Sequence, residues 1–101
     1  MKRIINGKKY DTDTAREVAV WDNCRDATDF AYVEQHLYRK RTGEYFLYGF
    51  GGPHSSYAEH KHGAWQFGSA ITPLTDNKAR KWGEAHMDVD AYEAEFGEVE
   101  E

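Results

Sequence analysis

The sequence has one cysteine, two methionines and no hydrophobic run that could form a membrane helix. A membrane helix needs about 20 consecutive apolar residues, and residues 1–7 lack the apolar stretch of a signal peptide. The single cysteine, Cys24, cannot form a disulfide within the chain, which fits a reducing compartment. We therefore expect a protein without a membrane segment that stays in the cytoplasm.

Motifs of common enzyme and metal sites are also missing. The Gly51-Gly52-Pro53 run lacks the lysine and following helix of a phosphate-binding loop, and no serine has the setting of a nucleophile elbow. His54, His60 and His62 form the one metal-like cluster, but Lys61 would repel a cation and the spacing matches no known zinc site. We expect a protein that is not an enzyme and has no catalytic residue, no cofactor and no metal.

What the chain does contain is aromatic and charged side chains, at 15% and 31% of its residues. A core built from rings and β-branched residues favours sheet over a helical bundle. Its 101 residues suffice for one core, so we expect a single domain over residues 1–101. The formal charge of −5 is uneven: residues 82–101 hold eight carboxylates and no lysine or arginine, whereas residues 1–81 are net +3.

Turn and cap residues predict an α+β fold. The Asn6-Gly7 pair is typical of a type I′ turn and predicts a hairpin over residues 3–10. Alternating residues predict a long aromatic hairpin over residues 30–50, with its turn at Thr42-Gly43, and a fifth strand over residues 65–74. Residues 54–63 show no periodicity and are predicted to be a loop.

Three helices are expected from their caps. Thr14 and Glu17 have capping-box spacing and predict a helix ending near residue 22; Thr75 and Asp88 or Asp90 predict two more. The expected architecture is an antiparallel sheet of about five strands, two hairpins plus one strand, with two or three helices packed on one face. The predicted core contains Trp21, Leu37, Leu47, Trp65 and Trp82.

Two surfaces have unusual chemistry. At the tip of the aromatic hairpin, Arg39, Lys40 and Arg41 lie near Tyr38 and Tyr45, which suits contacts to phosphates and stacking on bases. A solvated turn beside a half-buried sheet is the competing interpretation. The second surface is an acidic C-terminal helix and tail over about residues 84–101, which could imitate a phosphate backbone or simply aid solubility. Its candidate contacts are Asp88, Asp90, Glu93, Glu95 and Glu98.

Six runs along nearly the whole chain resemble a group of small accessory proteins from phages and other mobile elements of Firmicutes and gut metagenomes. These runs are residues 5–12 (INGKKYDT), 34–39 (EQHLYR), 42–49 (TGEYFLYG), 51–53 (GGP), 71–75 (ITPLT) and 79–82 (ARKW). The group includes anti-CRISPR proteins, which inhibit RNA-guided nucleases of type II. The resemblance implies a binding role in a bacterial host cell and supplies no catalytic residue.

The leading hypothesis is therefore an inhibitor that binds a CRISPR effector nuclease, or its guide ribonucleoprotein, and blocks DNA engagement. The alternative is a nucleic-acid-binding accessory protein of a mobile element that uses the hairpin tip. A third hypothesis is a small metal-binding or enzymatic domain centred on His54, His60 and His62.

Overall fold

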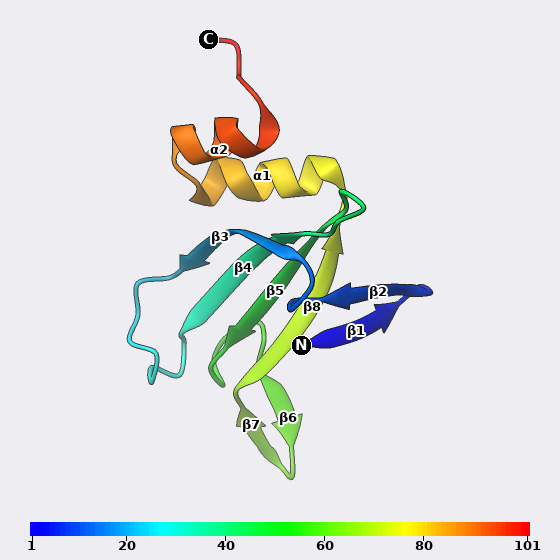
Figure 1. The fold of residues 1–101 in the computed structure, drawn as a ribbon. Coiled ribbons are helices and arrows are strands. Elements are labelled where there is room, and N and C mark those ends of the chain that lie inside the picture. The colour runs from blue at the N-terminus through cyan, green and yellow to red at the C-terminus, as the bar shows by residue number, and fades with distance from the viewer.

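The computed structural model describes residues 1–101 and confirms the α+β class. Its centre is a four-stranded antiparallel sheet of order β3-β4-β5-β8 (Figure 1). These strands are β3 (Arg16–Asp22), β4 (Val33–Arg39), β5 (Tyr45–Gly51) and β8 (Gly68–Leu74). Two separate hairpins project from the sheet: β1 (Lys2–Ile5) with β2 (Lys8–Asp11), and β6 (Glu59–Lys61) with β7 (Ala64–Gln66).

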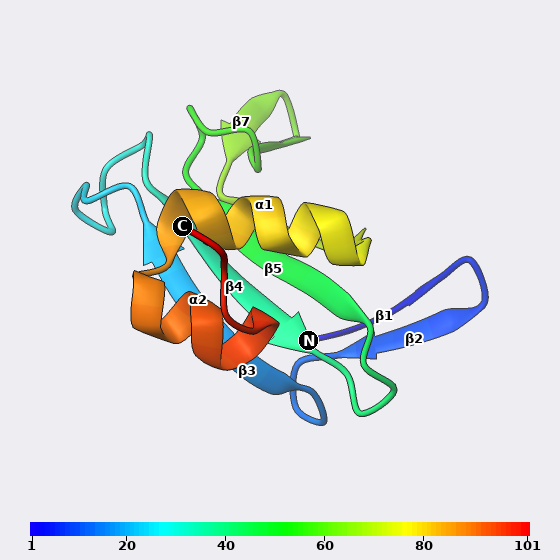
Figure 2. The ribbon, with the colours of Figure 1, turned by 90° about the horizontal axis from the view of Figure 1, so that it is seen from above.

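The helices α1 (Asp76–His86) and α2 (Val89–Phe96) follow the last strand and cover one face of the sheet. Both begin at the predicted caps, since the Thr75 side chain accepts the Lys78 N–H and the Asp88 side chain accepts the Ala91 N–H. Seen from above, the two helices lie side by side across the strands (Figure 2). Neither helix is long and apolar enough to cross a membrane.

Side chains alternate along β5 and divide the interior into two cores. Tyr45 and Leu47 face the helices and pack with Leu37 and Ala79 in the first core. Phe46 faces the opposite side, where it packs with Tyr10 of the N-terminal hairpin and with Ile71 in the second core. The Asn6-Gly7 turn of this hairpin has φ values of 50° and 76°, as predicted for a type I′ turn.

The predicted core is only partly correct. Leu37 and Leu47 are buried, whereas Trp21 and Trp82 are half-buried. Trp82 packs against the first core and donates its Nε1–H to Gln35 at 2.9 Å. Trp65 is 61% exposed because it lies on the projecting β6–β7 hairpin, so its assignment to the core is wrong.

The predicted helix over residues 14–22 is also wrong: residues 16–22 form strand β3, paired along β4. A bulge between Glu17 and Ala19 shifts the register, and Val18 packs against the first core beside Ala19, which pairs with Leu37. Two neighbouring residues therefore point to the same face. Because the bulge breaks the alternation of buried and exposed residues, the apolar spacing resembles that of a helix and the strand could not be recognised from the sequence.

The segment predicted as a loop contains strand β6, which turns at His62-Gly63 with φ values of 52° and 77°. The expected fifth strand is divided into β7 and β8, with Gly68 at the start of β8. A side chain at Gly68 would meet the Tyr57 carbonyl oxygen at 2.1 Å, so the close approach of these two segments requires glycine. β8 also continues through Pro73 to Leu74, which is compatible with its place at the edge of the sheet.

Candidate functional site

The C-terminal helices meet closely because Gly83 of α1 is buried against α2. A Cβ at this position would lie 3.0 Å from the rings of both Tyr92 and Phe96 and 3.2 Å from the sulfur of Met87. Gly83 therefore lets the backbone of α1 approach the side chains of α2. The result is a pair of helices with a shallow channel between them and the tail that follows.

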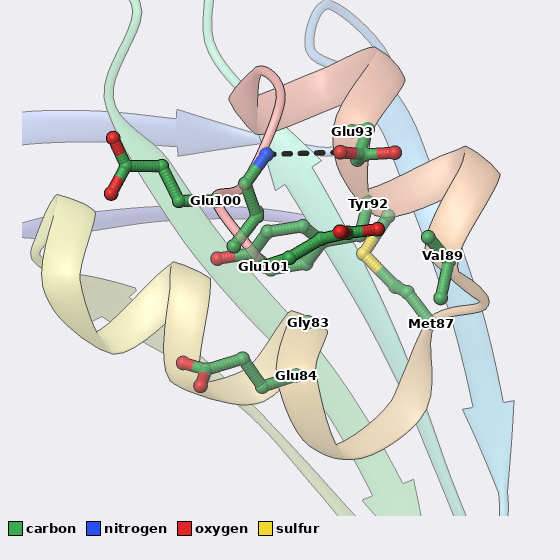
Figure 3. A pocket seen from close by; sticks show the side chains of 9 residues that line it. Gly83, Glu84, Met87, Val89, Tyr92, Glu93, Glu100 and Glu101 are labelled. Atoms are coloured by element: carbon green, nitrogen blue, oxygen red, sulfur yellow. Dashed lines mark hydrogen bonds between the residues drawn. The ribbon is translucent and has the colours of Figure 1, made fainter.

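The tail forms the second wall of this channel. Gly97 ends α2 with φ 96°, a conformation that favours glycine, and turns the chain back over the helices. The Val99 N–H then donates to the Glu93 carboxylate at 2.9 Å, as the dashed line in Figure 3 marks. A side chain on the helix thus fixes the first part of the tail.

The two helices and the tail line an open cavity of about 660 Å³, which we call the acidic groove. Its apolar lining comes from Met87, Val89, Tyr92 and Val99, and its carboxylates are Glu84, Glu93, Glu100 and Glu101 (Figure 3). Val89 and Val99 are 72% and 59% exposed, so the apolar lining is open to a partner. The groove offers contact area for apolar groups surrounded by negative charge.

Only one of the eight carboxylates in residues 82–101 is paired with a cation in the structure. Glu95 turns away from the groove toward the sheet, where it binds Arg16 at 2.8 Å and Arg39 at 3.4 Å. The Tyr45 hydroxyl donates to it at 2.6 Å. The remaining seven have no cationic partner within the chain: Glu84, Asp88, Asp90, Glu93, Glu98, Glu100 and Glu101.

The surroundings of Glu95 set the ionisation of two groups. Burial of Glu95 opposes its charged form, but the hydrogen bond from Tyr45 and the pairs with Arg16 and Arg39 outweigh it, so the pKa of this carboxyl is lowered. Burial and the hydrogen bond to Glu95 raise the pKa of Tyr45 to about 12. At neutral pH the carboxylate is ionised and the phenol keeps its proton.

The ten residues predicted to contact a partner are divided among different roles. Arg39, Tyr45 and Glu95 come together in the network just described, which joins α2 to the sheet. Asp88 caps α2, and Tyr38 stacks on Phe46 with ring centroids 5.2 Å apart. The remaining five are Lys40, Arg41, Asp90, Glu93 and Glu98; the hairpin-tip cations lie apart from the acidic groove.

Sequence reasoning missed the apolar half of the groove. Its signal was present, since Val89 and Val99 are isolated β-branched residues among carboxylates, where a purely solvated helix and tail would be polar throughout. It also missed a cluster on the sheet face opposite the helices: His36 binds Glu17 through Nδ1 and Glu34 through Nε2, and Tyr32 donates to Glu34.

We expect this cluster to make the stability of the protein depend on pH. Burial opposes the charged form of His36, but the contacts with Glu17 and Glu34 outweigh it and raise its pKa. Burial likewise opposes ionisation of Glu34, but hydrogen bonds from Tyr32 and His36 lower its pKa. The His36 contribution is full below its ordinary value of 6.5 and is lost as pH rises through the raised value. The Glu34 contribution is full above 4.5 and is lost as pH falls through the lowered value.

We therefore expect this cluster to stabilise the fold most between about pH 4.5 and 6.5. The free energy of unfolding, measured in urea at low salt, should fall as pH rises from 6.5 through the raised pKa of His36, and His36→Gln should remove most of that fall. His54→Gln is the control and should retain it. Burial lowers the pKa of His86, so this residue makes the free energy of unfolding fall as pH drops below 6.5, which is the opposite direction to the effect of His36. An unchanged pH profile in His36→Gln would contradict the assignment.

Each of the three histidines of the metal-like cluster, which was expected to hold no metal, has a different structural setting. His60 packs edge-on against Trp65 with ring centroids 5.0 Å apart, and His54 packs in the same way against Phe30 at 5.5 Å. His62 forms the β6–β7 turn. No group of three histidine, cysteine or acidic side chains in residues 1–101 is arranged to hold a metal ion.

Comparison with protein-family models, with curated proteins and with solved structures finds no match to this chain.

Proposed function

We propose that this protein is a binding inhibitor whose acidic groove occupies a basic, nucleic-acid-binding channel of its partner. The observation that supports this most is the gathering of seven carboxylates without cationic partners on α1, α2 and the tail. Carboxylates that stabilise a fold are normally paired or hydrogen-bonded, whereas five of these seven have neither a cation nor a hydrogen bond to the backbone: Glu84, Asp90, Glu98, Glu100 and Glu101.

The partner that the sequence resemblance indicates is a CRISPR effector nuclease or its guide ribonucleoprotein. Such an effector holds its RNA–DNA heteroduplex in a positively charged channel. Carboxylates on a protein surface are steered toward such a channel and compete there with phosphate, more weakly as salt rises. The apolar lining of the groove adds contact area that phosphate lacks, and this gives binding a component that is insensitive to salt.

Three of the eight carboxylates in residues 82–101 have structural roles and are not suitable for a test of this proposal. Glu95 supports α2, Asp88 caps it and Glu93 holds the tail, so changing any of them would disturb the groove itself. The informative substitutions are at Glu84, Glu100 and Glu101, which line the groove, and at Glu98, which precedes the lining residue Val99. The side chains of these four residues make no hydrogen bond within the chain.

The test is a DNA-cleavage assay with purified type II effectors, in which the inhibitor concentration for half inhibition is measured at low and physiological salt. In one variant Glu84, Glu98, Glu100 and Glu101 are changed to Gln. Its concentration for half inhibition should rise at least about tenfold, because electrostatic steering and contacts at the rim of the interface are lost. The control removes the same charge elsewhere, through Asp13→Asn, Glu44→Gln, Glu59→Gln and Asp76→Asn, and should stay within about twofold of the parent.

Two results would contradict the proposal. If the groove variant inhibits as well as the parent at low salt while both are folded by circular dichroism, competition with phosphate is the wrong mechanism. If the parent inhibits no type II effector and binds none in a pull-down, the partner class is wrong.

A further inference from the structure

A second charged surface lies where the β2–β3 loop meets the β4–β5 turn. Two adjoining open cavities of about 250 and 430 Å³ share Thr14, Ala15, Lys40 and Arg41 in their linings. Together we call them the basic groove, because their cationic residues are Lys9, Arg16, Arg39, Lys40 and Arg41. Figure 2 shows the loop and the turn next to each other at the end of the sheet near the N-terminus.

The folding of the N-terminal hairpin builds this groove. Tyr10 packs edge-on against Phe46 at 5.5 Å and brings the end of β2 beside the β4–β5 turn. The Lys40 ammonium then lies 4.2 Å from the centre of the Tyr10 ring, which holds the side chain by a cation–π contact. Asp11 is 5% exposed and accepts the Asp13 N–H at 2.9 Å, which fixes the loop. The fold therefore holds Lys40 at the groove through Tyr10.

The charge of the groove is unbalanced in favour of the cations. Arg16 and Arg39 are neutralised in part by Glu95, and Lys9 lies 4.0 Å from Asp11. Lys40 and Arg41 have no carboxylate partner. Among the residues that line the groove and their ion-pair partners, five cations face two carboxylates, a balance of +3 in a chain whose net charge is −5. Glu44 lies outside the linings and is paired with Lys8, although its charge also interacts with Lys40. Unpaired positive charge kept together on an acidic protein favours an anionic ligand.

We propose that the basic groove binds the phosphate backbone of a single-stranded nucleic acid. The cations come from two separate segments and follow two adjoining cavities, whereas a lone phosphate would need donors converging on one point. A flexible strand can follow such a short path between a loop and a turn, and its phosphates accept from lysine, arginine and threonine side chains. No base-stacking role is assigned to Tyr38 and Tyr45: Tyr38 stacks on Phe46, and Tyr45 is buried under the helices.

This surface is distinct from the acidic groove, and the proposal does not depend on the inhibitor function. Its test is fluorescence anisotropy with a labelled single-stranded RNA of about 20 uridines, a length that covers one or two sites of this kind. We expect the parent to bind with an affinity that falls as salt rises. Lys40→Ala with Arg41→Ala should weaken binding at least tenfold at low salt and reduce the salt slope by about 1.4, which corresponds to two lost phosphate contacts at about 0.7 each.

The matched control is Lys78→Ala with Lys81→Ala. It removes the same charge from two exposed lysines of α1 that have no ion pair and lie outside the basic groove, and it should bind within about twofold of the parent. Because Lys40 packs on Tyr10, its loss could loosen the hairpin, so Arg41→Glu serves as a second variant that keeps this contact. It should lose at least tenfold as well.

Three outcomes would overturn the proposal: a parent that does not bind the RNA, equal losses in the groove variant and the Lys78/Lys81 control, or an Arg41→Glu variant that binds like the parent. The last experiment is a competition in which inorganic phosphate is added to the bound RNA. Displacement of the RNA by phosphate beyond that caused by chloride of equal ionic strength would assign the groove to free phosphate and overturn the choice of ligand. Displacement equal to that of chloride supports the backbone.

Discussion

Phe46→Ala should lower the free energy of unfolding by about 3–5 kcal/mol, the range for removing a fully buried phenylalanine. Phe46 has no exposed surface and lies between Tyr10, whose ring meets it edge-on, and Tyr38, whose ring stacks on it. Through Tyr10 it joins the N-terminal hairpin to the sheet. For a domain of this size the loss corresponds to a fall in melting temperature of about 14–24 °C, and thermal unfolding followed by circular dichroism measures it.

The matched control is Phe67→Ala, because Phe67 is 49% exposed and belongs to neither core. It should change the free energy of unfolding by less than about 1 kcal/mol. Hydrogen exchange adds a second measurement: in Phe46→Ala the amides of β1 and β2 should lose protection before those of β4 and β5. A Phe46→Ala variant as stable as Phe67→Ala would show that the second core contributes little to the fold.

The elements that the sequence predicted correctly are those that depend on local chemistry. Asn6-Gly7 forms its turn through two residues in the left-handed region. Thr75 and Asp88 each accept an N–H three residues ahead, and Gly97 ends the last helix. All of these interactions lie within six residues of their origin, so the residues that form them can be recognised together in the sequence.

Strand β3 could not be predicted in this way because its partners are distant. Its residues pair with β4, which begins more than ten residues later, and Arg16 binds Glu95 from the far end of the chain. The local pattern around Thr14 and Glu17 fits a helix N-terminus, but pairing with β4 and burial of Val18 favour the strand. Tertiary contacts here override a weak local preference.

The candidate site shows the same division. The excess of carboxylates after residue 82 is visible in the composition, but which of them face solvent is decided by the packing of α2. In the structure Glu95 of α2 turns toward the sheet, whereas Glu98 and Glu100, in the tail after α2, are exposed. The partners of Glu95 come from β3, β4 and β5, so no local sequence pattern could predict that these side chains come into contact.

Glu95→Ala should therefore destabilise the protein by roughly 2–3 kcal/mol, although it removes a residue from an acidic helix with an excess of like charge. The Glu95 side chain is 8% exposed, and its loss leaves the Tyr45 hydroxyl, Arg16 and Arg39 without their acceptor. Both arginines reach solvent, so the expected cost lies below the 3–5 kcal/mol typical of fully buried pairs. Urea unfolding at neutral pH measures the difference.

Glu98→Ala is the control, since Glu98 has no partner within the chain, and it should remain within about 0.5 kcal/mol of the parent. The pH dependence separates an ionic role from loss of packing. The pKa of Glu95 is lowered in the folded protein, so its electrostatic contribution is present above the ordinary value of 4.5 and is lost as pH falls through the lowered value. The gap between Glu95→Ala and the parent should therefore narrow in acid. A gap that stays constant with pH would mean that Glu95 supports α2 through packing alone, and that the network with Arg16, Arg39 and Tyr45 does not hold the acidic groove in place.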